Sequence, residues 1–336
     1  MTNEPSRSHD PSESIGPTDP TDPTDLTHLV AHLDQVVVGK GPQLQVVVAA
    51  ILAGGHVLIE DVPGVGKTLA AKAIAARLGL SFARIQFTPD MLPSDVTGAV
   101  YFDQRDREFV FRPGPVFAGL VLADEINRAP AKTQAALLQA MAEQEISVDG
   151  TTHALPRPFH VIATANPIEY EGTFPLQEAQ LDRFLVRATL GYPDLASELH
   201  LVRETARAGV AALSRPPVTS ARAIDLRQAQ ARLCLVNVSD EVSRYIVDLV
   251  AATRDDRSLA LGASPRGSLA LTQCGQALAL LRGRSYVTPA DVQDLAVPVL
   301  AHRVVLRTEL WGSQTDTTRI IRRIVEHTPA PDSWNA

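Results

Sequence analysis

One short stretch does most to limit what this chain can fold into. It covers residues 61–68 and reads Asp61, Val62, Pro63, Gly64, Val65, Gly66, Lys67, Thr68. An apolar run at 56–60 comes before it, and a helical pattern at 69–78 follows it. In a turn between a strand and a helix, glycines let backbone N–H groups surround a phosphate, and the helix N-terminus adds positive potential. The stretch therefore predicts a phosphate-binding loop within an α/β sheet.

Two side chains of this loop would carry its chemistry. Lys67 would reach the β- and γ-phosphates of a nucleotide, and Thr68 would offer its hydroxyl to Mg²⁺. The general pattern G-x-x-x-x-G-K-[ST] has a glycine where this chain has Asp61, which leaves the geometry of the loop open. The alternative is an ordinary helix start at Lys67-Thr68, and the strand and glycines around it count against that interpretation.

Residues 26–192 are expected to form a nucleotide-binding core. Five apolar, strand-like runs alternate there with helical patterns, at 56–60, 82–87, 119–124, 160–165 and 184–190. This rhythm predicts a doubly wound α/β fold with a five-stranded parallel sheet flanked by helices. Two hairpins are expected as insertions, near 97–111 and 145–156, the second because Asp149-Gly150 separates two alternating runs.

Residues 193–328 are expected to form a second domain that is entirely helical. Helical patterns occur at 194–208, 221–233, 239–254, 265–283, 289–301 and 317–326. The start of one of them, Thr288-Pro289-Ala290-Asp291, combines an N-cap residue with proline in the first turn. Residues 1–25 contain Pro-Thr-Asp three times and are expected to be a disordered tail, and residues 329–336 a C-terminal tail.

Composition argues against several function classes. A formal net charge of -7 and a pI near 5.7 lack the basic footprint of a nucleic-acid-binding protein. No apolar stretch is long enough for a membrane span, and the N-terminus lacks the pattern of a signal peptide. Cys234 and Cys274 lie in apolar stretches without a C-x-x-C or histidine neighbour, and are interpreted as core residues in a reducing compartment. We therefore expect a cytoplasmic protein with no nucleic-acid partner.

Polar side chains end two of the expected strands. Asp124 and Glu125 follow one apolar run, so that Asp124 would orient Mg²⁺ or its waters and Glu125 would polarise an attacking water. Asn166 ends the next run at the same expected sheet edge, within reach of that water or of the γ-phosphate. Its alternative role is that of a turn former before Pro167.

Three arginines are candidates for the transition-state charge. Arg183 lies at the start of the fifth expected strand, where it would serve a neighbouring subunit as an arginine finger. Arg187 is a rival for this role, and a surface pair with Asp182 is the ordinary alternative for Arg183. Arg266 opens a helix of the second domain, where the helix dipole favours acidic residues instead. Its placement suggests that it reaches across the domain cleft to a nucleotide.

In this order, the features resemble those of AAA+ ATPases: Walker A, Walker B, sensor 1, arginine finger and sensor 2. Longer strings closely resemble the MoxR family: Gly-Pro-Val-Phe at 114–117, Ala-Asp-Glu-Ile-Asn-Arg-Ala-Pro at 123–130, Ala-Thr-Ala-Asn-Pro-Ile-Glu-Tyr-Glu-Gly-Thr at 163–173 and Glu-Ala-Gln-Leu-Asp-Arg-Phe at 178–184. The resemblance covers about residues 30–328. It implies an AAA+ P-loop core followed by a helical lid domain, with ATP and Mg²⁺ as cofactors.

The resemblance to the MoxR family also implies an assembly and a role. It implies a homo-hexameric ring with ATP sites between subunits, Arg183 acting in trans, and both hairpins facing the pore. It places Val38 by the adenine, although hydrophobicity alone fits a buried strand at 37–39 equally well. Family members are similar to the ATPase subunit of magnesium chelatase and are thought to mature other protein complexes as chaperones. Their partners often carry a von Willebrand factor A domain.

Other functions that use such a loop are weighed against this one. GTP specificity usually brings Asn-Lys-x-Asp, and the chain contains no Asn-Lys dipeptide. The acidic balance disfavours a DNA or RNA motor. Two alternatives stay open: a nucleotide-dependent scaffold or switch with little turnover, and a magnesium-chelatase-like ATPase subunit. The leading prediction is an ATPase that converts hydrolysis into remodelling or maturation of a client protein.

Overall fold

The computed structural model of the chain describes residues 26–167, 173–209, 223–310 and 316–332. The expected disordered tail at 1–25 lies outside these ranges, as do residues 333–336 of the expected C-terminal tail. Residues 168–172, which belong to one of the strings that resemble the MoxR family, also lie outside the described residues.

The core contains a five-stranded parallel sheet. Its strands are β1 (Val57–Glu60), β2 (Phe82–Gln86), β5 (Leu120–Asp124), β8 (His160–Ala165) and β9 (Val186–Ala188). Their spatial order is β2-β5-β8-β1-β9, and every neighbouring pair is parallel. This confirms the predicted fold class. The register pairs Glu60 with Ala165 and Gln86 with Asp124, so the strands that precede the candidate site residues end at one edge of the sheet.

The central strands are buried on both faces, because successive residues alternate between two apolar clusters. Val57 and Ile59 of β1 join one cluster, and Leu58 between them joins the other. The helices that contribute to the first cluster include α1 (Leu29–Val36), α2 (Gly41–Leu52) and α3 (Lys67–Arg77); those of the second are α4 (Pro93–Thr97) and α5 (Ala131–Glu143). Burial on both faces explains why the strands read as unbroken apolar runs in the sequence.

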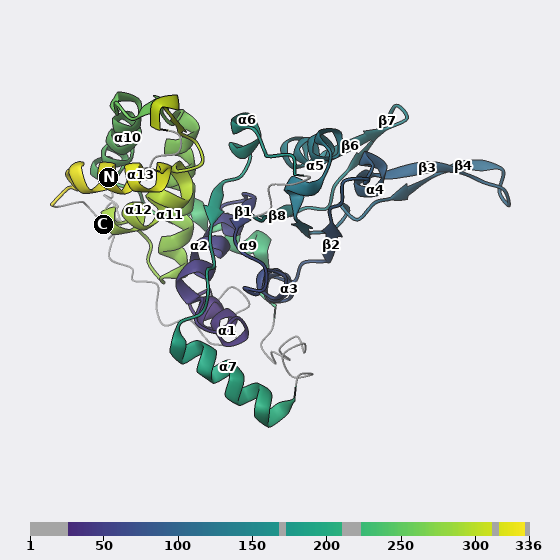
Figure 1. The fold of residues 1–336 in the computed structure, drawn as a ribbon, viewed down its shortest axis with the longest axis horizontal. Coiled ribbons are helices and arrows are strands. Elements are labelled where there is room, and N and C mark those ends of the chain that lie inside the picture. The colour runs from purple at the N-terminus through teal and green to yellow at the C-terminus, as the bar shows by residue number, and fades with distance from the viewer. Residues whose placement is uncertain (1–25, 168–172, 210–222, 311–315, 333–336) are drawn as a thin grey trace, which may run out of the picture.

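Both expected hairpins are present. The first joins β3 (Gly98–Asp103) to β4 (Glu108–Pro113), and the second joins β6 (Glu145–Val148) to β7 (Thr151–Ala154). Asp149 and Gly150 both have positive φ, 48° and 79°, as the two-residue turn of the second hairpin requires. The β3–β4 ribbon extends well beyond the body of the molecule (Figure 1). The two hairpins touch where Phe111 stacks on His153, with ring centroids 3.9 Å apart.

The C-terminal part is helical, as predicted. Its helices are α7 (Leu195–Ala208), α9 (Leu226–Ala231), α10 (Asp240–Asp255), α11 (Pro265–Leu281), α12 (Pro289–Leu300) and α13 (Thr317–His327). Helices α10 to α13 gather on one side of the core, whereas α7 lies apart from them (Figure 1). A short 3-10 helix (Ile126–Arg128) lies between β5 and α5 of the core. Helix α6 (Glu178–Leu181) and then β9 are the last core elements before α7.

Three details of this part differ from the sequence-based expectation. The lid also contains a small antiparallel pair, β10 (Leu259–Leu261) with β11 (Val305–Leu306), whose strands are too short to show a recognisable alternation. The helix expected at 221–233 is observed only over Leu226–Ala231, as α9. Asp225 caps its start, and a 3-10 turn at Leu233–Leu235 follows it. Cys274 is buried as expected, but Cys234 is exposed. Cys234 lies in that 3-10 turn, so its apolar neighbours do not form a continuous helix face.

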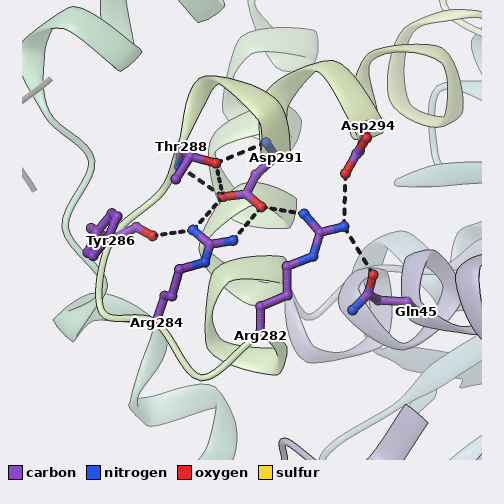
Figure 2. Close-up of polar contacts among 7 residues, drawn as sticks. All are labelled: Gln45, Arg282, Arg284, Tyr286, Thr288, Asp291 and Asp294. Atoms are coloured by element: carbon purple, nitrogen blue, oxygen red, sulfur yellow. Dashed lines mark hydrogen bonds and ion pairs between the residues drawn. The ribbon is translucent and has the colours of Figure 1, made fainter. Parts of the chain in front are cut away.

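A buried carboxylate at the start of α12 fixes the lid against the core (Figure 2). Asp291 accepts hydrogen bonds from the Thr288 backbone N–H at 2.8 Å, from Arg284 at 2.6 Å and from Arg282 at 2.7 Å. Arg282 also donates to Gln45 of α2 at 3.1 Å. Burial favours a higher pKa for Asp291, but the bonds from Arg284 and Thr288 outweigh it, and the pKa lies below its ordinary value. Asp291 therefore stays ionised and joins the turn before α12 to a core helix through Arg282.

Candidate functional site

The loop at 61–68 has the backbone that anion binding requires. Gly64 and Gly66 have φ angles of 86° and 89°, a region that residues with a side chain seldom adopt. Gly66 is the N-cap of α3, and Lys67 is the first residue of that helix. Free N–H groups at a helix N-terminus and a loop with positive φ angles together form a phosphate cradle. The expected loop–helix arrangement is therefore present.

Asp61 explains how the loop tolerates a residue other than glycine at its first position. Asp61 does not have a positive φ, so the backbone there needs no glycine. Its buried carboxylate accepts hydrogen bonds from the backbone N–H groups of Leu190 at 2.7 Å and Gly191 at 2.6 Å. The Lys67 ammonium donates to the Asp61 carbonyl at 2.8 Å. Asp61 thus joins the loop to the segment that follows β9.

Val38 lies in the turn between α1 and α2, and the buried-strand alternative for 37–39 is not observed. This turn is in contact with the phosphate-binding loop, because a Cβ built on Gly66 would lie 3.4 Å from Cγ1 of Val37. On its other side, a Cβ on Gly39 would meet the side chain of Ser197 in α7. The turn is therefore packed between the phosphate-binding loop and α7.

Asp124, the last residue of β5, is held by two neighbouring strands. Its Oδ1 accepts a hydrogen bond from the Thr164 hydroxyl of β8 at 2.5 Å. Its Oδ2 accepts two from the Arg84 guanidinium of β2, at 2.6 Å and 3.2 Å. Asp124 is mostly buried, whereas Arg84 is about half exposed. The sequence interpretation did not include Arg84.

Glu125 has an unusual backbone for a residue with a large side chain. Its φ is 57° and ψ 49°, in the left-handed region, which is a hint of functional constraint. The backbone N–H donates to the Thr164 hydroxyl at 2.9 Å. The carboxylate oxygen Oε2 accepts from Gln86 at 2.9 Å and from Arg128 at 3.1 Å. Arg84 and Gln86 are two residues apart on β2, which is paired with β5, so their side chains lie on the same face of the strand. This spacing was the only signal in the sequence that could have linked them to the Asp124-Glu125 pair.

Asn166 follows β8 and is buried. Its backbone carbonyl accepts a hydrogen bond from Asn127 at 3.4 Å. A cavity of about 400 Å³ opens there, at the ends of β1 and β8; its lining includes Asn166, Asn127, Glu60, Thr173 and Leu181. Asn166 is therefore at the sheet edge where the sequence placed it.

The candidate arginines have different partners. Arg183 is exposed, and its Nη1 donates to the carbonyl of Leu138 in α5 at 2.8 Å. Arg187 is held within its own chain by an ion pair of 3.2 Å with Glu60. This contact makes Arg187 the weaker candidate for a role in a neighbouring subunit.

Arg266 extends from the lid to the core. The core residue that it meets is Asp182, at 3.2 Å, instead of a residue of the phosphate-binding loop. Asp182 directly precedes Arg183 in the chain. Arg266 is largely exposed, with 75% of its side-chain surface accessible, so this pair is open to exchange with other partners.

The donor set fits a magnesium nucleotide. Thr68 and Asp124 offer oxygen ligands, which Mg²⁺ prefers, together with phosphate oxygens of a substrate. Within the described ranges, no group of three His, Cys, Asp or Glu residues could hold a metal ion without such help. In the same ranges, no helix combines the length and apolarity that crossing a bilayer requires.

Comparison with known families identifies both parts of the chain. A model described as "ATPase family associated with various cellular activities (AAA)" matches residues 56–186. A model described as "AAA lid domain" matches residues 251–324.

Individual proteins are similar over most of the chain. An uncharacterised protein, YeaC of Bacillus subtilis, is 46% identical over 90% of this chain and 93% of its own length. Chaperone MoxR1 of Mycobacterium tuberculosis is 40% identical over 91% of this chain and 82% of its own. Among solved structures, a Cytophaga hutchinsonii protein assigned as an ATPase superposes with a TM-score of 0.82 at 36% identity. That superposition covers 90% of this chain and 94% of the other.

Proposed function

Because the chain belongs to the MoxR family of AAA+ ATPases, we propose that it binds and hydrolyses MgATP and uses this reaction to remodel or mature a client protein. One observation carries the proposal. The ends of three adjacent strands bring together the loop at 61–68, the Asp124-Glu125 pair and Asn166. A loop that merely bound phosphate would need no second carboxylate at this edge.

Each residue of this group has a role in the proposed reaction. The loop residues hold the phosphates through backbone N–H groups, and Lys67 neutralises charge on the β- and γ-phosphates. Thr68 and Asp124 hold Mg²⁺, which would screen the phosphate charge when bound. Glu125 orients and polarises the attacking water, and Asn166 bonds the same water or the γ-phosphate. Val38, with its neighbours in the turn, lines the adenine subsite.

We further propose that the active assembly is a homo-hexameric ring with ATP sites between subunits. Arg183 supports this proposal, because it is exposed at the surface of its own subunit. It would approach the γ-phosphate bound by the adjacent subunit and stabilise the transition-state charge. Arg266, which is also exposed, would act close to it.

The β3–β4 hairpin is the proposed contact with the client. It exposes Tyr101, Phe102 and Phe109, the last with 77% of its surface accessible. Large aromatic side chains on a projecting ribbon are typical of surfaces that bind other proteins. A relative that is named a chaperone agrees with this role, and the family resemblance suggests a partner with a von Willebrand factor A domain.

Two alternatives compete with this proposal. A nucleotide-dependent scaffold would bind ATP with little turnover, and its Glu125 would have no catalytic task. A magnesium-chelatase-like subunit would hydrolyse ATP by the same residues but serve metal insertion. The first is tested by turnover, and the second by stimulation of turnover with a protein client.

The first experiment measures ATP turnover against protein concentration for the unaltered chain, Glu125→Gln, Arg183→Ala and Arg187→Ala. We expect specific activity to rise with concentration, because the site forms between subunits. Glu125→Gln should bind ATP and lose about 100-fold or more in turnover. Arg183→Ala should lose about 1,000-fold, and Arg187→Ala much less. Activity that is flat with concentration and survives Arg183→Ala would refute the shared site, and unchanged turnover in Glu125→Gln would favour the scaffold.

A further inference from the structure

The lid holds the short segment that carries Arg183. Arg303, in the turn after α12, donates from Nε to Asp182 at 2.9 Å. Its Nη2 donates to the Phe184 carbonyl at 2.9 Å and its Nη1 to the Leu185 carbonyl at 3.1 Å. Arg303 thus binds residues on both sides of Arg183, although it does not contact the Arg183 side chain itself in any of these bonds.

The same arginine is firmly anchored in the lid. Its Nη1 also donates to the carbonyl of Val299, in the last turn of α12, at 2.6 Å. Only 4% of its side-chain surface is accessible. A guanidinium has a fixed, planar set of five donors, so four acceptors around it define its orientation and that of the bound segment. Asp182, Phe184 and Leu185 are therefore held in one geometry relative to the end of α12.

His302 adds a second bond from the lid to the same segment. Its Nε2 donates to the Phe184 carbonyl at 2.9 Å. Burial, with the charge of Arg303 beside it, lowers the pKa of His302 to about 3, so the ring stays neutral near pH 7. The Phe184 carbonyl therefore receives two lid donors, one charged and one neutral.

This arrangement is costly for a purely structural contact. Burying the guanidinium of Arg303 requires desolvation that an apolar side chain of similar volume avoids. Of the two arginines that meet Asp182, Arg303 is buried and Arg266 is exposed. The buried one sets the position of the segment, and the exposed one is free to change partner.

We propose that Arg303 is a positioning residue for the arginine finger: it holds Arg183 in the pose that the neighbouring subunit's site needs, and thereby makes that pose depend on the lid. The inference rests on the proposed role of Arg183 in trans. It adds that the lid of one subunit influences hydrolysis in the next. A shift of the end of α12 would displace 182–185, and a displacement of about 1 Å is enough to cost about 100-fold in rate.

Mixed-subunit complementation tests this proposal. Glu125→Gln subunits should hydrolyse little ATP but carry an intact Arg183. Arg303→Ala subunits should retain a competent loop and Glu125 but offer a misplaced Arg183, so alone they should turn over ATP about 10-fold to 100-fold more slowly. Mixed in equal amounts with Glu125→Gln, roughly half of the Arg303→Ala sites should meet a good finger, since each subunit in a ring meets one neighbour through this face. Turnover per Arg303→Ala subunit should rise accordingly, and mixing with Arg183→Ala should produce no rise.

Two further variants separate positioning from stability. Arg303→Lys keeps a charge near Asp182, but an ammonium has three donors and cannot satisfy all four acceptors, so it should show the same pattern with a smaller loss. Arg284→Ala is the matched control, because it removes another lid arginine from a buried aspartate without contacting 182–185 (Figure 2). It should lower the melting temperature, leave turnover of the folded protein largely intact, and show no rise on mixing with Glu125→Gln.

The outcomes distinguish failure of the positioning role of Arg303 from failure of the proposed role of Arg183 in trans. If Arg183→Ala is not raised by Glu125→Gln, the shared site fails and this inference fails with it. If Arg183→Ala is raised but neither Arg303 variant is, Arg303 has only a structural role. Should Arg303→Ala not fold, as judged by its melting curve, Arg303→Lys decides between the same two results. Normal turnover in a folded Arg303→Ala would also overturn the proposal.

Discussion

Asp124 and Glu125 each share their carboxylate with a cation of the same chain. Arg84 bonds Oδ2 of Asp124, and Arg128 bonds Oε2 of Glu125. These charge-assisted hydrogen bonds hold each carboxylate in a defined orientation. The same arginines, however, bind carboxylate oxygens that would otherwise be available to Mg²⁺ or to the attacking water. We therefore expect Arg84 to compete with Mg²⁺ for Asp124.

Replacing Arg84 tests this competition. In Arg84→Ala, we expect half-maximal turnover at a free Mg²⁺ concentration that is lower by about 2-fold to 5-fold, because a half-exposed ion pair is worth up to about 1 kcal/mol. The measurement is ATP turnover in a magnesium titration. Arg128→Ala is the control, since it removes the same charge from Glu125 and should alter turnover without changing the magnesium requirement. A higher magnesium requirement in Arg84→Ala would mean that Arg84 instead holds Asp124 in place for the metal.

The residues that sequence reasoning found and missed differ in a physical way. Lys67, Thr68, Asp124 and Glu125 could be proposed because each belongs to a short local pattern whose chemistry depends on neighbours in the chain. The contacts of Arg84 and Arg303 join residues 40 and about 120 positions apart. Such contacts depend on strand register and on how the lid packs, neither of which a single sequence determines.

Among the elements, α12 has the most strongly defined start. Thr288 and Asp291 form a reciprocal capping box, and Asp291 also receives Arg282 and Arg284. Capping bonds alone are worth about 1 kcal/mol. The two arginines make Asp291 far more important than a cap, because each would lose a buried partner with it.

Neutralising this carboxylate should destabilise the lid strongly. We expect Asp291→Asn to lower the free energy of unfolding by about 3–5 kcal/mol, since it leaves two arginines without their buried partner. Asp294→Asn is the matched control: its carboxylate also binds Arg282 but is about half exposed, so the loss should stay under about 1 kcal/mol. Urea unfolding followed by circular dichroism measures both. Equal losses in the two variants would contradict the importance assigned to the buried site.

Element prediction succeeded where a pattern was long enough to recognise. The five strands and the Asp149-Gly150 hairpin follow from apolar runs and turn residues. The β10–β11 pair was missed because its strands have three and two residues. The bounds predicted for α9 were too wide because Asp225 caps a helix of only six residues. Short elements are determined by tertiary packing, which leaves no period in the sequence.

At the scale of the whole molecule, core and lid share one apolar cluster. It runs from Val57 and Ile59 of the sheet through α2 to Leu271 and Leu278 of α11. Local patterns predicted two parts in sequence but could not show that their interiors merge. Because the cluster is continuous, we expect a substitution that destabilises the packing of the sheet to lower the stability of both core and lid. Buried histidines, in turn, make the stability of the folded chain depend on pH.

His56 illustrates this sensitivity, because both of its ring nitrogens are used. Nδ1 accepts a hydrogen bond from the Val161 N–H at 3.0 Å, and Nε2 donates to the Met141 carbonyl at 3.2 Å. Burial, with His160 nearby, lowers the pKa of His56 to about 4. Burial also lowers the pKa of His160 and lowers that of His302 to about 3. These rings are neutral in the folded protein at a pH where they would take up protons if it unfolded.

The sign of the pH dependence follows from these pKa values. Below about pH 6.5 the unfolded chain binds protons at these histidines that the folded chain does not, so the free energy of unfolding should fall as pH falls from about 6.5 to 4. His56→Gln removes one such proton, and glutamine can still accept from Val161 and donate to Met141. The variant should therefore melt with a shallower dependence of Tm on pH over this interval, even if its Tm at pH 7.5 is lower. His200→Gln, on an exposed position of α7, should leave that slope unchanged. Calorimetric melting between pH 4 and 8 measures the slopes. Identical slopes in His56→Gln and the unaltered chain would contradict the prediction, because they would mean that His56 binds its proton equally in the folded and unfolded states.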